Sequence, residues 1–317
     1  MNPRYLAITG GVGGAKLCVG LARLLGPDQL AFLVNTGDDF EHLGLHVSPD
    51  LDTLTYALAD LSNPETGWGR RDESWHFIET LRGLGGEGWF NLGDRDLALH
   101  VLRSQWLRAG TGLGEVTDRL RRAHGIAHAL LPMSDDPVRT EVHTKAGTLA
   151  FQHYFVRERC APAVTGFSFA GVESARLNAE ARAWLADPTL AGVIVCPSNP
   201  FVSIDPILAI PGLREALRDC PAPVVAVSPI VAGLAIKGPT AKMMEELRVP
   251  QTAVAVATHY EDILDGFILD AQDEALIPAL AARDLPAIAT PSVMVTLDDK
   301  IALARTTLTF IHSLYAP

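Results

Sequence analysis

Short apolar runs alternate with helical periodicity along most of this chain. The runs Tyr5–Thr9, Leu30–Val34, Gly192–Cys196 and Val224–Ser228 are continuously apolar rather than alternating. Continuous runs of this length are typical of parallel strands that are buried on both faces. Between them lie stretches with the apolar spacing of amphipathic helices, such as Ala15–Leu25. The pattern therefore predicts an α/β fold, Rossmann-like and doubly wound around a mainly parallel sheet.

Two segments interrupt this alternation. Residues 62–126 are rich in helical periodicity and predict a helical insertion, in which one helix opens with Asp94 as its N-cap. Residues 133–160 contain the alternating segments RTEVHT and TLAFQHYFV on either side of Lys145-Ala146-Gly147, which predicts a β-hairpin subdomain projecting from the main sheet. We therefore expect one Rossmann-like domain over residues 1–317 with these two additions.

The composition is that of an ordinary globular protein. Of the 317 residues 48% are apolar and 20% charged, and no apolar run approaches the ~20 residues needed to span a bilayer. The amino terminus enters a strand and a glycine-rich segment without the long apolar region of a signal peptide. We therefore expect a cytoplasmic protein with no membrane contact.

Charge and cysteine usage exclude further classes. A formal net charge of -11 argues against nucleic acid or an anionic membrane as partner, because both demand a basic surface. It does not exclude a phosphorylated small molecule, which backbone N–H groups, a few local cations and a metal can bind. The four cysteines lie far apart without a C-x-x-C pair, so they predict neither a zinc site nor a disulfide framework.

The segment GGVGGAK follows the first predicted strand and predicts a glycine loop before the helix Ala15–Leu25. It fails the dinucleotide-binding fingerprint, since Lys16 stands at the last glycine position, and it lacks the end of a P-loop. It nevertheless suits a phosphate, because glycines let the backbone approach closely and a helix N-terminus supplies oriented N–H groups. The alternative is that the glycines serve only a tight turn and close packing.

An acidic loop follows the strand Leu30–Val34. It brings Asp38, Asp39, Asp50 and Asp52 to the carboxyl end of that strand, where ligands collect in open α/β sheets. Four carboxylates in so short a span repel one another unless a cation lies among them, and Mg²⁺ prefers such oxygen ligands. The alternative is structural: Asp50 begins a helix and the earlier aspartates are turn residues.

Together these motifs resemble those of a known family. In chain order GGVGGAKL, VNTGDD, SPDLDT, GDRDLALHVLR, LPMSDDPV, SNPFVSIDPIL, VAVSPIV and KGPTAKMM resemble the 2-phospho-L-lactate transferases, often called CofD or FbiA, over about Ile8 to Asp270. The resemblance implies a Mg²⁺-dependent, homodimeric enzyme of coenzyme F-420 biosynthesis with a Rossmann-like core. In that reaction the deazaflavin alcohol Fo attacks the diphospho-5'-guanosine conjugate of a phosphorylated hydroxy acid, and GMP leaves.

The resemblance also suggests roles for individual residues. The four aspartates of the acidic loop are the expected Mg²⁺ ligands, and Asp50 and Asp39 are the expected catalytic residues, with Asp50 as the base for the ribityl hydroxyl. The expected substrate-binding residues are Gly11, Gly13, Gly14, Lys16, Asn35, Thr36, Asp94, Arg95, His100, Ser198, Asn199, Ser228, Lys237 and Lys242. Asp94, Arg95 and His100 can equally belong to a solvated helix face.

Two other classes of protein share parts of the pattern. A non-catalytic regulator of the same superfamily that binds nucleotide sugars has a similar opening glycine segment. A nicotinamide oxidoreductase is suggested by the strand-helix-strand opening, but the fingerprint fails and the second strand ends in Asn35 rather than an acidic residue. The sequence leaves the hydroxy acid open among phospholactate, phosphoenolpyruvate and phosphoglycerate.

Overall fold

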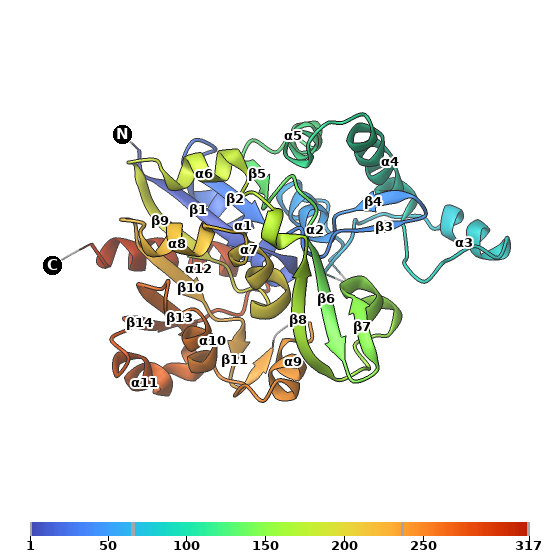
Figure 1. The fold of residues 1–317 in the computed structure, drawn as a ribbon. Coiled ribbons are helices and arrows are strands. Elements are labelled where there is room, and N and C mark those ends of the chain that lie inside the picture. The colour runs from blue at the N-terminus through green and yellow to red at the C-terminus, as the bar shows by residue number, and fades with distance from the viewer. Residues whose placement is uncertain (1, 65–66, 236–237, 316–317) are drawn as a thin grey trace.

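The computed structural model describes residues 2–64, 67–235 and 238–315 and has a parallel sheet at its centre (Figure 1). Within these residues the sheet has seven strands, in the order β14-β13-β10-β9-β1-β2-β5, and every neighbouring pair is parallel. The strands are β1 (Arg4–Thr9), β2 (Leu30–Val34), β5 (Ala129–Pro132), β9 (Leu190–Val195), β10 (Val224–Val227), β13 (Gly266–Asp270) and β14 (Ala287–Thr290).

Helices cover both faces of the sheet, which explains why its strands are apolar throughout. Along β1, Tyr5 and Ala7 pack into one core while Leu6 and Ile8 pack into the other. The first core is closed by α1 (Gly11–Leu24), α2 (Pro49–Leu58) and α12 (Leu297–Ser313). The second is closed mainly by α6 (Ala179–Leu185), α7 (Asp205–Leu208), α8 (Leu213–Arg218), α10 (Ala253–His259) and α11 (Ile277–Ala281). The predicted doubly wound α/β fold is confirmed.

The two predicted additions are present as structural elements. Between α2 and β5 the chain forms α3 (His76–Gly83), α4 (Asp94–Arg108) and α5 (Leu113–Ala123), with α3 farthest from the sheet in Figure 1. A separate antiparallel sheet of three strands, β7-β6-β8, is built from β6 (Arg139–Thr144), β7 (Gly147–Ala150) and β8 (Val164–Ala170). Within the described residues no helix has the length and apolarity needed to cross a bilayer.

The remaining elements are short and occupy the connections. They include the hairpin β3 (Phe40–His42) and β4 (Leu45–Val47), the hairpin β11 (Ile230–Val231) and β12 (Leu234–Ala235), and helix α9 (Thr240–Glu246). Single helical turns are η1 (His153–Arg157), η2 (Val172–Ser174), η3 (Pro200–Ile204) and η4 (Ala271–Leu276).

Several local predictions were wrong in detail. Helix α1 begins at Gly11 rather than Ala15, so the predicted glycine loop forms the first turn of the helix. The second strand of the predicted hairpin ends at Ala150, and the chain then turns helical because Phe151 and Tyr154 pack into the core at helical spacing. Helix α4 is preceded by Gly93, so Asp94 is its first residue and not its N-cap. The hairpin β3–β4 and strand β14 were not predicted.

The strand order creates a switch point at the centre of the sheet. From β1 the chain proceeds outward through β2 to β5, and it then returns to the other side of β1 to form β9, β10, β13 and β14. The connections after β1 and β9 therefore diverge and leave a crevice at the carboxyl ends of these strands. Gly10 and the segment Pro197–Asn199 border this crevice.

Close packing of α1 against the connection after β9 explains the glycine at position 13. A Cβ atom on Gly13 would lie 2.4 Å from the carbonyl oxygen of Pro197. We expect Gly13→Ala to lower the free energy of unfolding by about 1 to 3 kcal/mol, because the first turn of α1 must move. Gly26→Ala is the matched control, with its nearest atom 3.7 Å from the added carbon. Equal melting temperatures of the two variants would contradict the packing argument.

Candidate functional site

A cavity of about 740 Å³ opens at the switch point and unites residues from all parts of the chain. One wall is the first turn of α1, another is the acidic loop after β2, and a third is the helical segment after β7. Its polar and charged lining is Lys16, Asp38, Asp50, Asp52, Thr53, Asn91, Asp96, His100, Gln152, Arg159, Ser198, Asn199, Ser203, Ser228, Thr240 and Ser292, and its large aromatic lining is Tyr56, Trp68, Trp89, Phe90, Phe151 and Phe155.

Two buried carboxylates share one amide at the floor of this cavity. Asn35 Nδ2 donates to Asp50 Oδ2 at 2.9 Å and more weakly to Asp38 Oδ1 at 3.4 Å. Burial raises the pKa of Asp38 well above its usual range, and the nearby charges of Asp50 and Asp39 add to this. Burial likewise raises the pKa of Asp50 to about 6, although hydrogen bonds from Asn35 and the Gly11 N–H oppose the shift. Such a pair favours a bound cation.

Asp39 supplies a further observation that fits a metal. Its Oδ2 accepts from Ser48 Oγ at 2.8 Å and lies 2.9 Å from His46 Nε2. Its Oδ1 is buried and has no hydrogen-bond partner within the described residues. An unpaired buried carboxylate oxygen beside two crowded carboxylates fits the hard oxygen ligands of Mg²⁺.

Asp52 belongs to a different cluster. Arg103, fully buried on α4, makes a bidentate ion pair with the Asp52 carboxylate. His100 lies between Asp52 and Asp96, with its two ring nitrogens 3.7 and 3.3 Å from their oxygens. These three groups lie close enough to hold a metal ion, but Arg103 already neutralises Asp52. The four predicted Mg²⁺ ligands therefore do not form a single cluster. Asp38 and Asp50 form a pair with Asp39 beside them, and Asp52 belongs to the second cluster.

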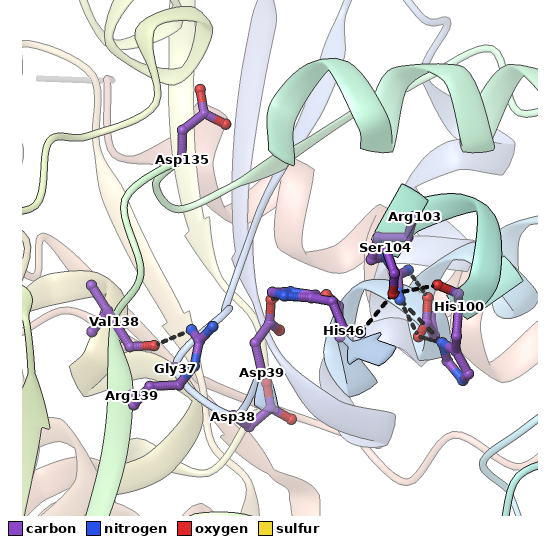
Figure 2. A network of polar contacts seen from close by, with 12 residues as sticks. Gly37, Asp38, Asp39, His46, His100, Arg103, Ser104, Asp135, Val138 and Arg139 are labelled. Atoms are coloured by element: carbon purple, nitrogen blue, oxygen red, sulfur yellow. Dashed lines mark hydrogen bonds and ion pairs between the residues drawn. The ribbon is translucent and has the colours of Figure 1, made fainter. Parts of the chain in front are cut away.

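A continuous polar chain connects the two clusters (Figure 2). His46, from β4, lies between Asp39 on the acidic loop and the α4 residues Ser104 and His100. Its backbone N–H donates to Ser104 Oγ at 2.7 Å, and Ser104 Oγ donates to the His100 carbonyl at 2.6 Å. The hairpin β3–β4 thus fixes the helical insertion to the acidic loop.

Some residues of the segment GGVGGAK border the cavity, and others pack against neighbouring strands and loops. Gly11, Gly13 and Lys16 border the cavity, whereas Gly14 is buried against Thr9 and Ser198. Gly11 adopts a φ of +63°, which glycine accepts without strain, and its N–H donates to the Asp50 carboxylate. The positive end of the α1 dipole is therefore directed at this acidic floor and at the cavity above it.

The remaining predicted residues fall into three groups. Ser198, Asn199 and Ser228 line the cavity, while Asn35 and Thr36 are buried below it. Three residues, Asp94, Arg95 and Lys242, lie outside its lining. Asp94 accepts hydrogen bonds from Ser74 and from the first N–H groups of α3, and Arg95 follows Asp94 in the chain. Lys242 forms an ion pair with Glu246. Lys237 lies outside the described residues.

Comparison with known proteins identifies the family. The family described as 2-phospho-L-lactate transferase CofD matches residues 6–306. The chain belongs to this family. A phosphoenolpyruvate transferase from Kitasatospora aureofaciens is 40% identical over 312 residues, covering 96% of this chain and 97% of the relative. One from Mycobacterium leprae is 40% identical over 310 residues, covering 89% and 92%. The resemblance inferred from the motifs is thereby confirmed, and the protein is an enzyme of a transferase family.

A solved structure shares the fold of this transferase. Protein BH3568 from Bacillus halodurans superimposes with a TM-score of 0.63 at 13% identity, covering 98% of this chain and 100% of that one. At this identity the similarity concerns the fold alone, and it agrees with the α/β architecture.

One wall of the site was missed from the sequence of this transferase. Gln152, Phe155, Val156 and Arg159 all line the cavity, and they follow a helical spacing of three, four and seven residues. The segment was predicted as a strand, which would have directed alternate residues to opposite faces. The helical spacing of these four residues was the signal that could have identified them.

Mg²⁺ is expected to stabilise this transferase strongly near pH 8 and weakly near pH 5. Because burial raises the pKa of Asp50 to about 6, the folded protein binds more protons than the unfolded chain between about pH 4 and 6. The stability of the metal-free protein therefore falls as the pH rises through this window. At a hundred-fold excess over its Kd, Mg²⁺ should raise the melting temperature by about 5 °C at the higher pH. Equal shifts at both pH values, measured by differential scanning fluorimetry at constant ionic strength, would contradict this.

Proposed function

We propose that this transferase joins the deazaflavin alcohol Fo to a phosphorylated hydroxy acid in coenzyme F-420 biosynthesis. The donor is the acid's diphospho-5'-guanosine conjugate, and GMP is the leaving group. The names of the relatives from Kitasatospora and Mycobacterium favour phosphoenolpyruvate as the acid. The observation that carries the proposal is the crowded, buried carboxylate pair Asp38 and Asp50 at the floor of a cavity large enough for two substrates.

The acidic floor suits phosphoryl transfer. Asp38 and Asp50, with the unpaired oxygen of Asp39, would hold Mg²⁺ against the donor diphosphate. When bound, Mg²⁺ neutralises the charge of the diphosphate and polarises the phosphorus that is attacked. The N-terminus of α1 and Lys16 add positive potential on the same side of the cavity.

The proposed step needs a base near the acidic floor. The ribityl oxygen of Fo forms a bond to the phosphorus that carries the acid, and the bond from this phosphorus to the oxygen bridging to GMP breaks. The hydroxyl proton passes to the Asp50 carboxylate, which lies at this floor. GMP leaves with the bridging oxygen, so charge and atoms balance.

The apolar part of the cavity suits the deazaflavin ring. Trp68, Trp89 and Phe90 contribute aromatic faces or edges to the lining. Flat conjugated rings bind well against such side chains. In the proposed arrangement Fo lies against the helical insertion, and the donor occupies the switch point with its acid end toward the segment after β7. The dimer and the cytoplasmic location remain predictions.

Mass spectrometry of reaction mixtures tests the function. The purified protein is incubated with Mg²⁺, Fo and each of the lactyl, enolpyruvyl and glyceryl conjugates, beside an Asp50→Asn variant. We expect an Fo phosphodiester and GMP in equal amounts, only with metal, fastest with the enolpyruvyl donor and largely lost in the variant. Absence of product with every donor, while guanine nucleotides still bind, would overturn the proposal in favour of a non-catalytic regulator.

A further inference from the structure

Arg159 contributes an unpaired positive charge to the cavity. Among the described residues of the lining, only Lys16 and Arg159 carry a permanent positive charge, against the four aspartates Asp38, Asp50, Asp52 and Asp96. The Lys16 ammonium donates to the carbonyl of Met294 at 2.7 Å. Arg159 is exposed, and its guanidinium has no ion-pair or hydrogen-bond partner within the described residues. A free guanidinium at the wall of a ligand cavity is available for an anion.

The backbone holds Arg159 in an unusual conformation. Arg159 and Cys160 have φ angles of +50° and +58°, in the left-handed region that normally requires glycine. Hydrogen bonds from Glu158 N to His153 O and from Cys160 N to Tyr154 O fix the end of the helical segment in this shape. Glycine would adopt this conformation without strain, so the backbone at Arg159 does not depend on its side chain.

The position of Arg159 relates it to the acidic floor. Gln152, Phe155, Val156 and Arg159 form one face of the segment after β7, and all four line the cavity. At one end Gln152 Nε2 approaches the backbone carbonyl and carboxylate of Asp38, at 3.4 and 3.5 Å. Arg159 lies seven residues further along the chain, two residues after the helical turn His153–Arg157 ends. Between them Phe155 and Val156 offer an apolar surface.

We infer that Arg159 binds the carboxylate at the acid end of the donor. This inference rests on the proposed function. The donor carries two anionic groups: a diphosphate, which the metal and the α1 N-terminus serve, and the carboxylate of a three-carbon acid. A guanidinium matches a carboxylate with two parallel hydrogen bonds, and Phe155 and Val156 suit the short carbon skeleton. With the diphosphate at the acidic floor, the carboxylate is directed along the segment toward Arg159.

The conformation of Arg159 provides an unusually clean variant. Arg159→Gly removes the guanidinium and places glycine where the backbone prefers it, so the variant should fold at least as stably as the wild type. Arg159→Lys keeps the charge but loses the paired hydrogen bonds. Arg157→Gln is the matched control, because Arg157 is exposed on the same segment, as Arg159 is, but lies outside the cavity lining.

Calorimetric binding without Fo tests the inference. The titrants are GDP and the lactyl diphospho-5'-guanosine conjugate, which differ only in the acid unit, each with Mg²⁺. We expect Arg159→Gly to weaken binding of the conjugate about 10- to 100-fold and to change GDP binding less than about two-fold. The affinity of Arg159→Lys for the conjugate should lie between those of the wild type and Arg159→Gly. Arg157→Gln should bind both titrants as the wild type does.

Each other outcome has a distinct meaning. Equal weakening of both titrants would overturn the inference, because Arg159 would then contact the shared diphosphate or nucleotide. Unchanged binding of the conjugate in Arg159→Gly would also overturn it. A wild-type protein that binds neither titrant would overturn the proposed function itself, and the inference with it.

Discussion

Replacing Asp38 with asparagine is expected to lower the rate of transfer about a thousand-fold and at the same time to stabilise the metal-free protein. The rate falls because the metal loses a carboxylate ligand. The stability rises because burial and the charges of Asp50 and Asp39 raise the pKa of Asp38, so ionised Asp38 costs folding free energy. The amide is neutral at every pH and should therefore raise the free energy of unfolding near pH 8.

The pH dependence separates this effect from ordinary changes in packing. Because the pKa of Asp38 is raised in the folded protein, the advantage of the Asp38→Asn variant should vanish in acid, where Asp38 is protonated. Asp262→Asn is a suitable control, since Arg214 holds the pKa of Asp262 below its usual range outside the cavity. That variant should keep full activity and gain no stability. Urea denaturation in the presence of EDTA measures the stability of both variants. A lower stability of Asp38→Asn than of the wild type would contradict the electrostatic argument.

Replacing Arg103 with methionine is expected to cost about 3 to 5 kcal/mol of unfolding free energy, or about 10 °C in melting temperature. Burial alone would lower the pKa of Arg103, but the paired Asp52 carboxylate more than offsets this and keeps the guanidinium charged. Without Arg103, Asp52 remains buried beside Asp96 with no permanent positive charge to neutralise it. Removing one partner of a buried pair is therefore far more costly than the net contribution of the pair.

A double-variant cycle isolates this cause. Adding Asp52→Asn to Arg103→Met removes the unpaired carboxylate and should recover at least half of the lost stability. Arg119→Met on α5 is the matched control, because its ion pair with Glu115 is largely exposed and contributes at most about 1 kcal/mol. If the losses of unfolding free energy caused by Arg103→Met and by Asp52→Asn simply add in the double variant, an unpaired charge is not the reason for the destabilisation.

The sequence predicted the sheet and the family because their signals are local. Continuous apolar runs identified four of the central strands, including β1 and β9, whose divergence creates the switch point. The ordered motifs identified the transferase family, which the family match confirms. Ser198 and Asn199 were expected in the site because they follow a buried strand, and they line the cavity. These predictions depend only on residues close together in the chain.

The partner of each charged group depends on how distant parts of the chain pack together. Asp50 and Asp52 are two residues apart, yet Asp50 shares Asn35 with Asp38, whereas Asp52 is neutralised by Arg103, 51 residues further along. Asp94 caps α3 rather than α4 because the chain between these helices folds back on itself. Such contacts depend on how the helical insertion docks, and the spacing of residues does not encode this.

The same reason explains the wall formed by the segment after β7. Its sequence is compatible with a strand, but the burial of Phe151 and Tyr154 selects a helix, and Gln152 and Arg159 of this segment then line the cavity. The sequence alone was enough to predict the fold, the family and the residue types of the site. The packing of the insertion and of this segment decided which carboxylates are crowded, which is neutralised, and where the free guanidinium lies, since electrostatic energies depend on distance and burial.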